Sequence, residues 1–156
     1  EAESHLRRRI AAAFPGDGVL GEEMGESAGD SGWRWILDPI DGTKSFIHGV
    51  PLYSVLIGLE IEGEVKVGAA YFPALDEMLA AASGLGCWWN GRRARVSAVS
   101  RLAEAVVTFT DPASFARYGR AAEWERIQKA CYYRAGWSDA VRLTVTGHPL
   151  LAGRLI

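Results

Sequence analysis

Two β-prone runs joined by a two-residue turn constrain the fold of this chain more than any other feature. The runs cover residues 53–61 and 64–72, and Glu62-Gly63 connects them. Apolar-rich runs with such a connection are typical of an antiparallel hairpin. Residues 77–82 return after a further turn, and Asn90-Gly91 is the dipeptide best suited to a type I′ hairpin. The sequence therefore predicts an antiparallel sheet at the centre of the chain.

Helices are predicted on either side of these strands along the chain. Residues 1–14 place Leu6, Ile10 and Phe14 at four-residue spacing, which is one face of a helix. Residues 114–131 are predicted to form a second helix with Ser114 as its N-cap. The other predicted elements are strands at 33–37, 84–88, 94–97 and 105–110, a short helix from Thr43 to about His48, and a mobile surface loop at 26–32. Together they predict a mixed α+β domain dominated by an antiparallel sheet.

Composition excludes several classes of protein. Of the 156 residues 49% are hydrophobic, which is typical of one globular domain and too high for a disordered chain. The formal net charge is −2, so we expect no nucleic-acid partner. No apolar run approaches the roughly 20 residues that span a bilayer, so no membrane association is predicted. The two cysteines, Cys87 and Cys131, are too few for a disulfide framework, and free thiols in the cytoplasm are predicted.

Two aspartates follow the strand predicted at 33–37. Asp38 and Asp41 are three residues apart across a turn that Pro39 stiffens, so both carboxylates can converge on one point. The backbone oxygen of Ile40 is a possible additional ligand. Mg²⁺ prefers such oxygen ligands, at about 2.0–2.1 Å in octahedral geometry. The segment therefore indicates a site for a hard cation.

Groups that could bind phosphate come directly after these carboxylates. Gly42 and Thr43 would present backbone amides at the start of the predicted short helix, where anions are stabilised. Upstream, Glu22 and Glu23 add two more carboxylates, and bound divalent cations would relieve the repulsion within such a cluster. Taken singly, the same acids are better explained as solvated loop charges and turn caps.

The combination resembles a known family. The segments GEE at 21–23 and WILDPIDGTKSF at 35–46 strongly resemble the inositol-monophosphatase-like family of Mg²⁺-dependent phosphatases. The resemblance runs from residue 1 to about residue 140 and includes the hairpins and GCWWNGRRARVS at 86–97. It implies a layered α/β sandwich, of which this chain holds mostly the N-terminal antiparallel sheet and its flanking helices. It also implies direct in-line hydrolysis of a phosphomonoester by metal-activated water, without a covalent phosphoenzyme.

The resemblance implies a set of metal ligands. Glu22 matches the first metal-binding glutamate, and Asp38 matches the carboxylate shared between two cations. Ile40 would contribute its backbone oxygen, and Asp41 would hold the second cation. Glu23 resembles a neighbour of the site rather than a ligand. Mg²⁺ is therefore the expected cofactor.

Phosphate binding and catalysis are implied for the adjoining residues. Gly42 and Thr43 match positions that contact phosphate, and the hydroxyl of Thr43 would also help to orient the attacking water. The implied catalytic residues are thus Thr43, Glu22 and Asp38.

The expected substrate is histidinol phosphate. Lys44, the PALDE segment at 73–77 and residues 134–139 look most like bacterial histidinol-phosphate phosphatases of this family. In those enzymes an acid at the position of Asp139 is implied to meet the ammonium group of the substrate, and a plain surface aspartate is about equally compatible. The alternative substrates are inositol 1-phosphate and related sugar or nucleotide phosphates. A homodimer is possible.

The family pattern extends past both ends of this sequence. The chain has no initiator Met, residue 1 falls inside a predicted helix, and a Trp-Asp pair that supplies another metal carboxylate in the family is not visible. We therefore expect a truncated, single partial domain over residues 1–156, in which 142–156 form an atypical tail. The rival hypothesis is a non-catalytic fragment that binds metal or phosphate, or an oligomer-forming structural piece.

Overall fold

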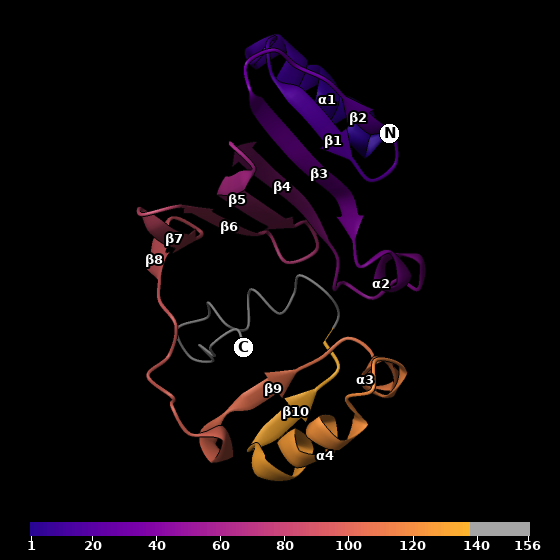
Figure 1. Cartoon of the computed structure of the whole chain (residues 1–156), viewed down its shortest axis with the longest axis vertical. Coiled ribbons are helices and arrows are strands. Elements are labelled where there is room, and N and C mark those ends of the chain that lie inside the picture. The colour runs from indigo at the N-terminus through magenta and orange to yellow at the C-terminus, as the bar shows by residue number, and fades with distance from the viewer. Residues whose placement is uncertain (138–156) are drawn as a thin grey trace. The chain divides into compact units, whose positions relative to one another are not determined.

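The structure, a computed structural model, describes residues 1–137 of the chain. It divides into two compact units, Glu1–Arg93 and a second unit that begins at Ala94 (Figure 1). Asp139 and the predicted atypical tail lie outside the described residues. A single partial domain stays a prediction.

The first unit is built on an eight-stranded sheet with the order β2-β1-β3-β4-β5-β6-β7-β8 (Figure 1). The strands are β1 (Gly18–Gly21), β2 (Gly25–Ser27), β3 (Trp33–Asp41), β4 (Ser54–Ile61), β5 (Glu64–Phe72), β6 (Glu77–Ala82), β7 (Gly86–Trp89) and β8 (Arg92–Ala94). Pairing is antiparallel from β3 through β7, which confirms the predicted antiparallel sheet. One pair differs, because β1 runs parallel to β3. That pair had no counterpart in the prediction.

The predicted turns have the backbone geometry that their sequences favour. Glu62 and Gly63 have φ values of 53° and 78°, and Asn90 and Gly91 have 46° and 75°. Two successive positive φ values define a type I′ turn, whose twist matches that of the flanking strands. After Asn90-Gly91 the return strand is β8, at Arg92–Ala94, so the strand predicted at 94–97 was wrong. A two-residue turn leads directly into its return strand, which places that strand earlier.

Helix α1, Ala2–Ala13, packs against the sheet through Leu6 and Ile10 of the predicted apolar face, whereas Phe14 lies past the end of the helix and is exposed (Figure 1). Its buried Ile10 contacts Val19 of β1 and Leu37 of β3, and Leu6 packs against the same cluster. The helix ends before Pro15, and the backbone N–H of Phe14 donates to the oxygen of Ile10. The cluster joins the first helix to the two parallel strands.

Two segments of the first unit differ from the prediction. Strand β3 continues to Asp41, beyond the end predicted at residue 37, because β4 pairs with it on both sides of Pro39. The segment predicted as a mobile loop at 26–32 begins as a strand, since β2 pairs with β1. Short strands of this kind show little local pattern, and their pairing partner determines them. The predicted short helix is confirmed as α2, Thr43–Ile47.

The second unit contains a small parallel pair and two helices. Strands β9 (Val106–Thr108) and β10 (Tyr133–Ala135) pair with each other, and α3 (Pro112–Arg117) and α4 (Ala121–Ala130) lie between them in sequence. A 3₁₀ turn, η1, covers Leu102–Glu104. The single helix predicted over 114–131 was wrong, because Gly119 at φ 70° interrupts it. Asp111, not Ser114, caps α3 by accepting from the N–H of Ala113.

Trp124 is the buried centre of this unit. It stacks on Phe115 with ring centroids 4.5 Å apart and meets Phe109 edge-on at 4.9 Å. Such aromatic packing contributes roughly 0.5–1.5 kcal/mol per pair beyond area burial.

Cys87 and Cys131 are free thiols. Within residues 1–137, no helix has the length and apolar character needed to cross a membrane.

Candidate functional site

The parallel pairing of β1 and β3 brings the two acidic segments together. Gly21 is opposite Leu37 in the register, and the backbone N–H of Glu22 donates to the oxygen of Leu37 at 3.2 Å. Parallel strands end at the same edge of a sheet, so Glu22 and Asp38, which follow these partners, lie next to each other. A hydrogen bond between their side chains, which requires one carboxyl to be protonated, helps to raise the pKa of Asp38. Two carboxyls sixteen positions apart in sequence thus meet at one edge.

A bulge in β3 brings Asp41 near the same point. Asp38 pairs with Leu56 and Asp41 with Ser54, so two residues of β3 lie opposite the single residue Val55. In a regular strand, side chains three residues apart point to opposite faces. One extra residue changes that alternation, and bulges of this kind often re-aim a side chain at a functional site. The negative charge of Asp41 accordingly acts on Asp38.

Asp38 has the most perturbed carboxyl of this cluster. Burial, followed by the charge and hydrogen bond of Glu22 and the charge of Asp41, raises the pKa of Asp38 to about 6. The hydrogen bond from the backbone N–H of Ile40, at 3.1 Å, acts in the opposite direction. Like charges held this close disfavour the ionised form, and a cation would reverse that effect.

The turn after Asp38 places the remaining candidates. The hydroxyl of Thr43 donates to the backbone oxygen of Ile40 at 2.9 Å, so the residue predicted to orient water contacts the predicted carbonyl ligand. Gly42 is buried and has φ 78°, a conformation that favours glycine, and it precedes α2. Thr43 is exposed, whereas Ile40 and Asp41 are half-buried. These four candidates therefore lie in one turn at the end of β3, and of the four Thr43 is the exposed one.

Ser54 is a residue of this site that the sequence reasoning missed. It is fully buried at the start of β4, and its hydroxyl donates to Oδ2 of Asp41 at 3.1 Å. The available signal was a polar residue at the start of an apolar strand, which needs a hydrogen-bond partner when buried.

The donor set fits a hard cation by its chemistry. The groups are carboxylate and carbonyl oxygens, with neither sulfur nor imidazole, which suits Mg²⁺ rather than Zn²⁺. As it stands, the part of the chain described here holds no group of three or more Asp, Glu, His or Cys residues arranged to bind a metal ion. The carboxyl of Asp38 interacts with that of Glu22, and the carboxylate of Asp41 accepts a hydrogen bond from Ser54. Side-chain rotation toward a cation would exchange these bonds for coordination.

Sequence comparison identifies the family. The chain matches the inositol monophosphatase family over residues 1–140, and it belongs to that family. A histidinol-phosphatase of Chlorobaculum parvum is 50% identical over 110 residues, which are 70% of this chain and 42% of that protein. An inositol-1-monophosphatase of Mesorhizobium japonicum is 43% identical over 108 residues, 69% of this chain and 41% of that protein.

Solved structures share the fold. The extragenic suppressor protein suhB of Bartonella henselae superposes with a TM-score of 0.86 at 34% identity, over 94% of this chain and 58% of that one. An IMPase of Thermotoga maritima gives 0.80 at 31% identity, over 98% of this chain and 57% of that one. These neighbours confirm the predicted fold class. The chain spans less than half the length of the curated relatives it matches.

Proposed function

We propose that the protein containing this chain hydrolyses a small phosphomonoester with the help of Mg²⁺. The observation that carries the proposal is the meeting of Glu22 and Asp38 at the ends of two parallel strands, with Asp41 brought near by the bulge. Family membership supports the same conclusion, since the relatives named above are phosphatases. It also disfavours the rival hypothesis of a non-catalytic fragment.

In this proposal the acidic cluster binds the cation and holds it against the turn. Glu22, Asp38, Asp41 and the oxygen of Ile40 would be the protein ligands. Bound Mg²⁺ would polarise water and neutralise charge on the phosphate and the leaving oxygen. Ser54 would keep the carboxylate of Asp41 oriented through its hydrogen bond. Support by such neighbouring hydrogen bonds commonly sets the affinity of a metal site.

Gly42 and Thr43 are the proposed phosphate contacts. Gly42 has no side chain to block the approach of a ligand to its backbone. In this proposal the hydroxyl of Thr43 accepts a hydrogen bond from the attacking water while it donates to the oxygen of Ile40, as it does in the structure. That pairing would hold the water in line with the phosphorus atom.

Histidinol phosphate is the favoured substrate. The similarity to a histidinol-phosphatase at 50% identity supports this choice. Asp139 would bind the ammonium group of the substrate, as a carboxylate suits an amine. Inositol 1-phosphate is the second candidate, because an inositol-1-monophosphatase is 43% identical over almost the same length. A cytoplasmic location and a homodimer stay predictions.

Phosphate release from both substrates, with and without MgCl₂, tests the function. A chimera in which the matched 110 residues of the Chlorobaculum parvum protein are replaced by those of this chain supplies the rest of the fold. We expect Mg²⁺-dependent release from histidinol phosphate by the chimera and none by its Asp38→Asn variant. A folded chimera that releases no phosphate from either substrate would contradict the proposal.

Substrate choice is tested by Asp139→Asn in a chimera that carries residues 1–140 of this chain, the span that the family model matches. We expect the ratio of kcat/KM for histidinol phosphate over inositol 1-phosphate to fall at least tenfold, with the inositol activity preserved. Equal loss on both substrates would show that Asp139 has no role in recognising the amine.

A further inference from the structure

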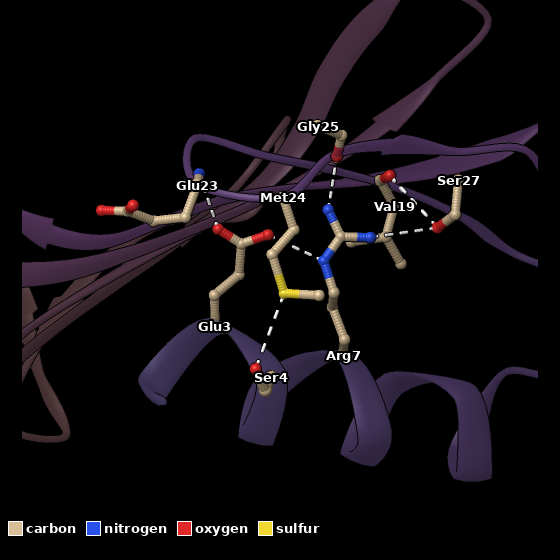
Figure 2. A network of polar contacts seen from close by, with 8 residues as sticks. All are labelled: Glu3, Ser4, Arg7, Val19, Glu23, Met24, Gly25 and Ser27. Carbon is tan, nitrogen blue, oxygen red and sulfur yellow. Dashed lines mark hydrogen bonds and ion pairs between the residues drawn. The ribbon is translucent and has the colours of Figure 1, made fainter.

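Helix α1 places a carboxylate directly beneath the turn that carries Glu22. Glu3 has 3% of its side chain exposed, and Ser54 is the other polar residue that is buried among the described residues. Oε2 of Glu3 accepts a hydrogen bond from the backbone N–H of Glu23 at 2.8 Å, and Oε1 of Glu3 accepts one from Nε of Arg7 at 2.7 Å (Figure 2). The buried carboxylate thus bonds to the residue next to Glu22.

Arg7 donates further hydrogen bonds to the segment that follows Glu23. Its guanidinium donates to the backbone oxygen of Gly25 and to Oγ of Ser27, the latter at 3.2 Å (Figure 2). Ser4, which lies between Glu3 and Arg7 on α1, donates to Sδ of Met24 at 3.6 Å. One face of α1 therefore bonds to several positions of the segment from Glu23 to Ser27.

The fit between Glu3 and this turn is close. A Cβ atom added to Gly21 would lie 2.0 Å from Oε1 and 2.4 Å from Cδ of Glu3. Glycine at this position lets the carboxylate reach Glu23, and the φ of Gly21 is not among the positive ones. The space at Gly21 is therefore filled by the Glu3 carboxylate.

These contacts hold Glu22 between two supports. Its own N–H bonds to Leu37 of β3, and the N–H of the next residue bonds to Glu3. Burying a carboxylate is costly, and an apolar side chain would dock α1 at lower cost. What a carboxylate adds is an acceptor for the N–H of Glu23. Docking of the helix alone does not account for that choice of residue.

We propose that Glu3, held by Arg7, is a positioning residue for Glu22, which it keeps directed toward Asp38 and the cation. The inference rests on the proposed function, because it takes Glu22 as a metal ligand. Groups that support metal ligands typically change affinity 10–100-fold when removed. Glu3 does not touch the cation or the substrate in this scheme.

The test measures Mn²⁺ binding by electron paramagnetic resonance of the free ion, with Mn²⁺ as a probe for Mg²⁺. We expect Glu3→Ala to raise the Mn²⁺ dissociation constant about tenfold and to speed amide hydrogen exchange at residues 22–24. Glu3→Gln keeps an acceptor for the N–H of Glu23 and should restore most of the affinity. Ile10→Ala is the matched control, since it loosens α1 from the core without touching the turn.

A double-mutant cycle separates positioning from general stability. Gly21→Ala should weaken Mn²⁺ binding in the wild-type background, because its Cβ displaces the Glu3 carboxylate. In the Glu3→Ala background the same substitution should have no further effect. All dissociation constants are measured at a temperature where every variant is folded.

The outcomes distinguish this inference from the proposed function. Equal weakening of Mn²⁺ binding by Ile10→Ala and Glu3→Ala, or no weakening by either, would overturn the positioning role. If Asp38→Asn binds Mn²⁺ as well as the wild type does, the cation site is wrong and the inference falls with it. Loss of binding in Asp38→Asn with unchanged binding in Glu3→Ala leaves the function intact and removes only the inference.

Discussion

The carboxyl of Asp38 has two acidic neighbours and is partly removed from water, which raises its pKa to about 6. Its ionised form is therefore unfavourable unless a cation lies beside it. Asp38→Asn removes one of the charges, and the amide of Asn can still donate to Glu22. At the scale of single residues, a carboxylate at position 38 thus suits a bound cation but lowers the stability of the chain when no cation is bound.

We predict that, at pH 7.5 without divalent cations, the free energy of unfolding of Asp38→Asn equals that of the wild type or exceeds it by up to about 1 kcal/mol. This figure allows for solvent screening. Added MgCl₂ should raise the unfolding midpoint of the wild type and leave that of Asp38→Asn unchanged. Urea unfolding with and without MgCl₂ measures both effects. Glu62→Gln, at an exposed acid in a hairpin turn, should keep the response to MgCl₂. A midpoint that rises with MgCl₂ in Asp38→Asn would refute the prediction.

The pKa of Glu3 is shifted in the direction opposite to that of Asp38. Burial raises the pKa of Glu3, but the hydrogen bonds from Arg7 and from the N–H of Glu23 outweigh it, and the pKa is lowered from 4.5. A carboxyl with a lowered pKa in the folded state stabilises the fold above the unfolded-state pKa, and this contribution is lost as the pH falls through the folded-state value.

We therefore expect the wild type to exceed Glu3→Gln in unfolding free energy by about 1 kcal/mol at pH 7. The difference should shrink steadily as the pH falls below about 4.5. Urea unfolding of both proteins from pH 7 to pH 3.5 gives the curve. A constant difference over that range would mean that the charge of Glu3 contributes nothing.

At the scale of elements, what the sequence predicted correctly depends on local signals. The hairpin at Glu62-Gly63 and the face of α1 follow from neighbouring residues, and the structure confirms both. The parallel pair β1–β3 was missed because its partners are far apart in sequence and β1 is only four residues long. The bulge at Pro39 was missed for a similar reason, since it depends on the register with β4.

The turn and the strand of one hairpin allow a matched comparison. Gly63 has φ 78° in the turn, and neither Gly63 nor Gly68 of β5 has an atom within 4 Å of an added Cβ. Gly63→Ala should destabilise the chain by about 1 kcal/mol, because an L residue is strained at that φ. Gly68→Ala should be neutral or slightly stabilising, since strand glycine is unfavourable. Equal effects in chemical denaturation would argue against a conformational origin.

At the scale of the whole molecule, the family and the candidate site came from one short motif and its upstream acids. DPIDGT at 38–43 and GEE at 21–23 were enough to indicate the site, and the comparisons confirm the family. The supports of the site, Glu3 and Ser54, were not predicted, because their role depends on burial and on contacts with distant backbone groups. Asp139 lies outside the described residues, so its role stays a prediction.

A titration of the ¹⁵N-labelled chain with MgCl₂, followed by two-dimensional NMR, tests most directly whether two distant acidic stretches bind one cation. We predict saturable shifts of the backbone amides of Glu22, Glu23 and the segment 38–43, with a common dissociation constant, and their loss in Asp38→Asn. Shifts in only one of the two stretches, or shifts that persist unchanged in Asp38→Asn, would contradict it.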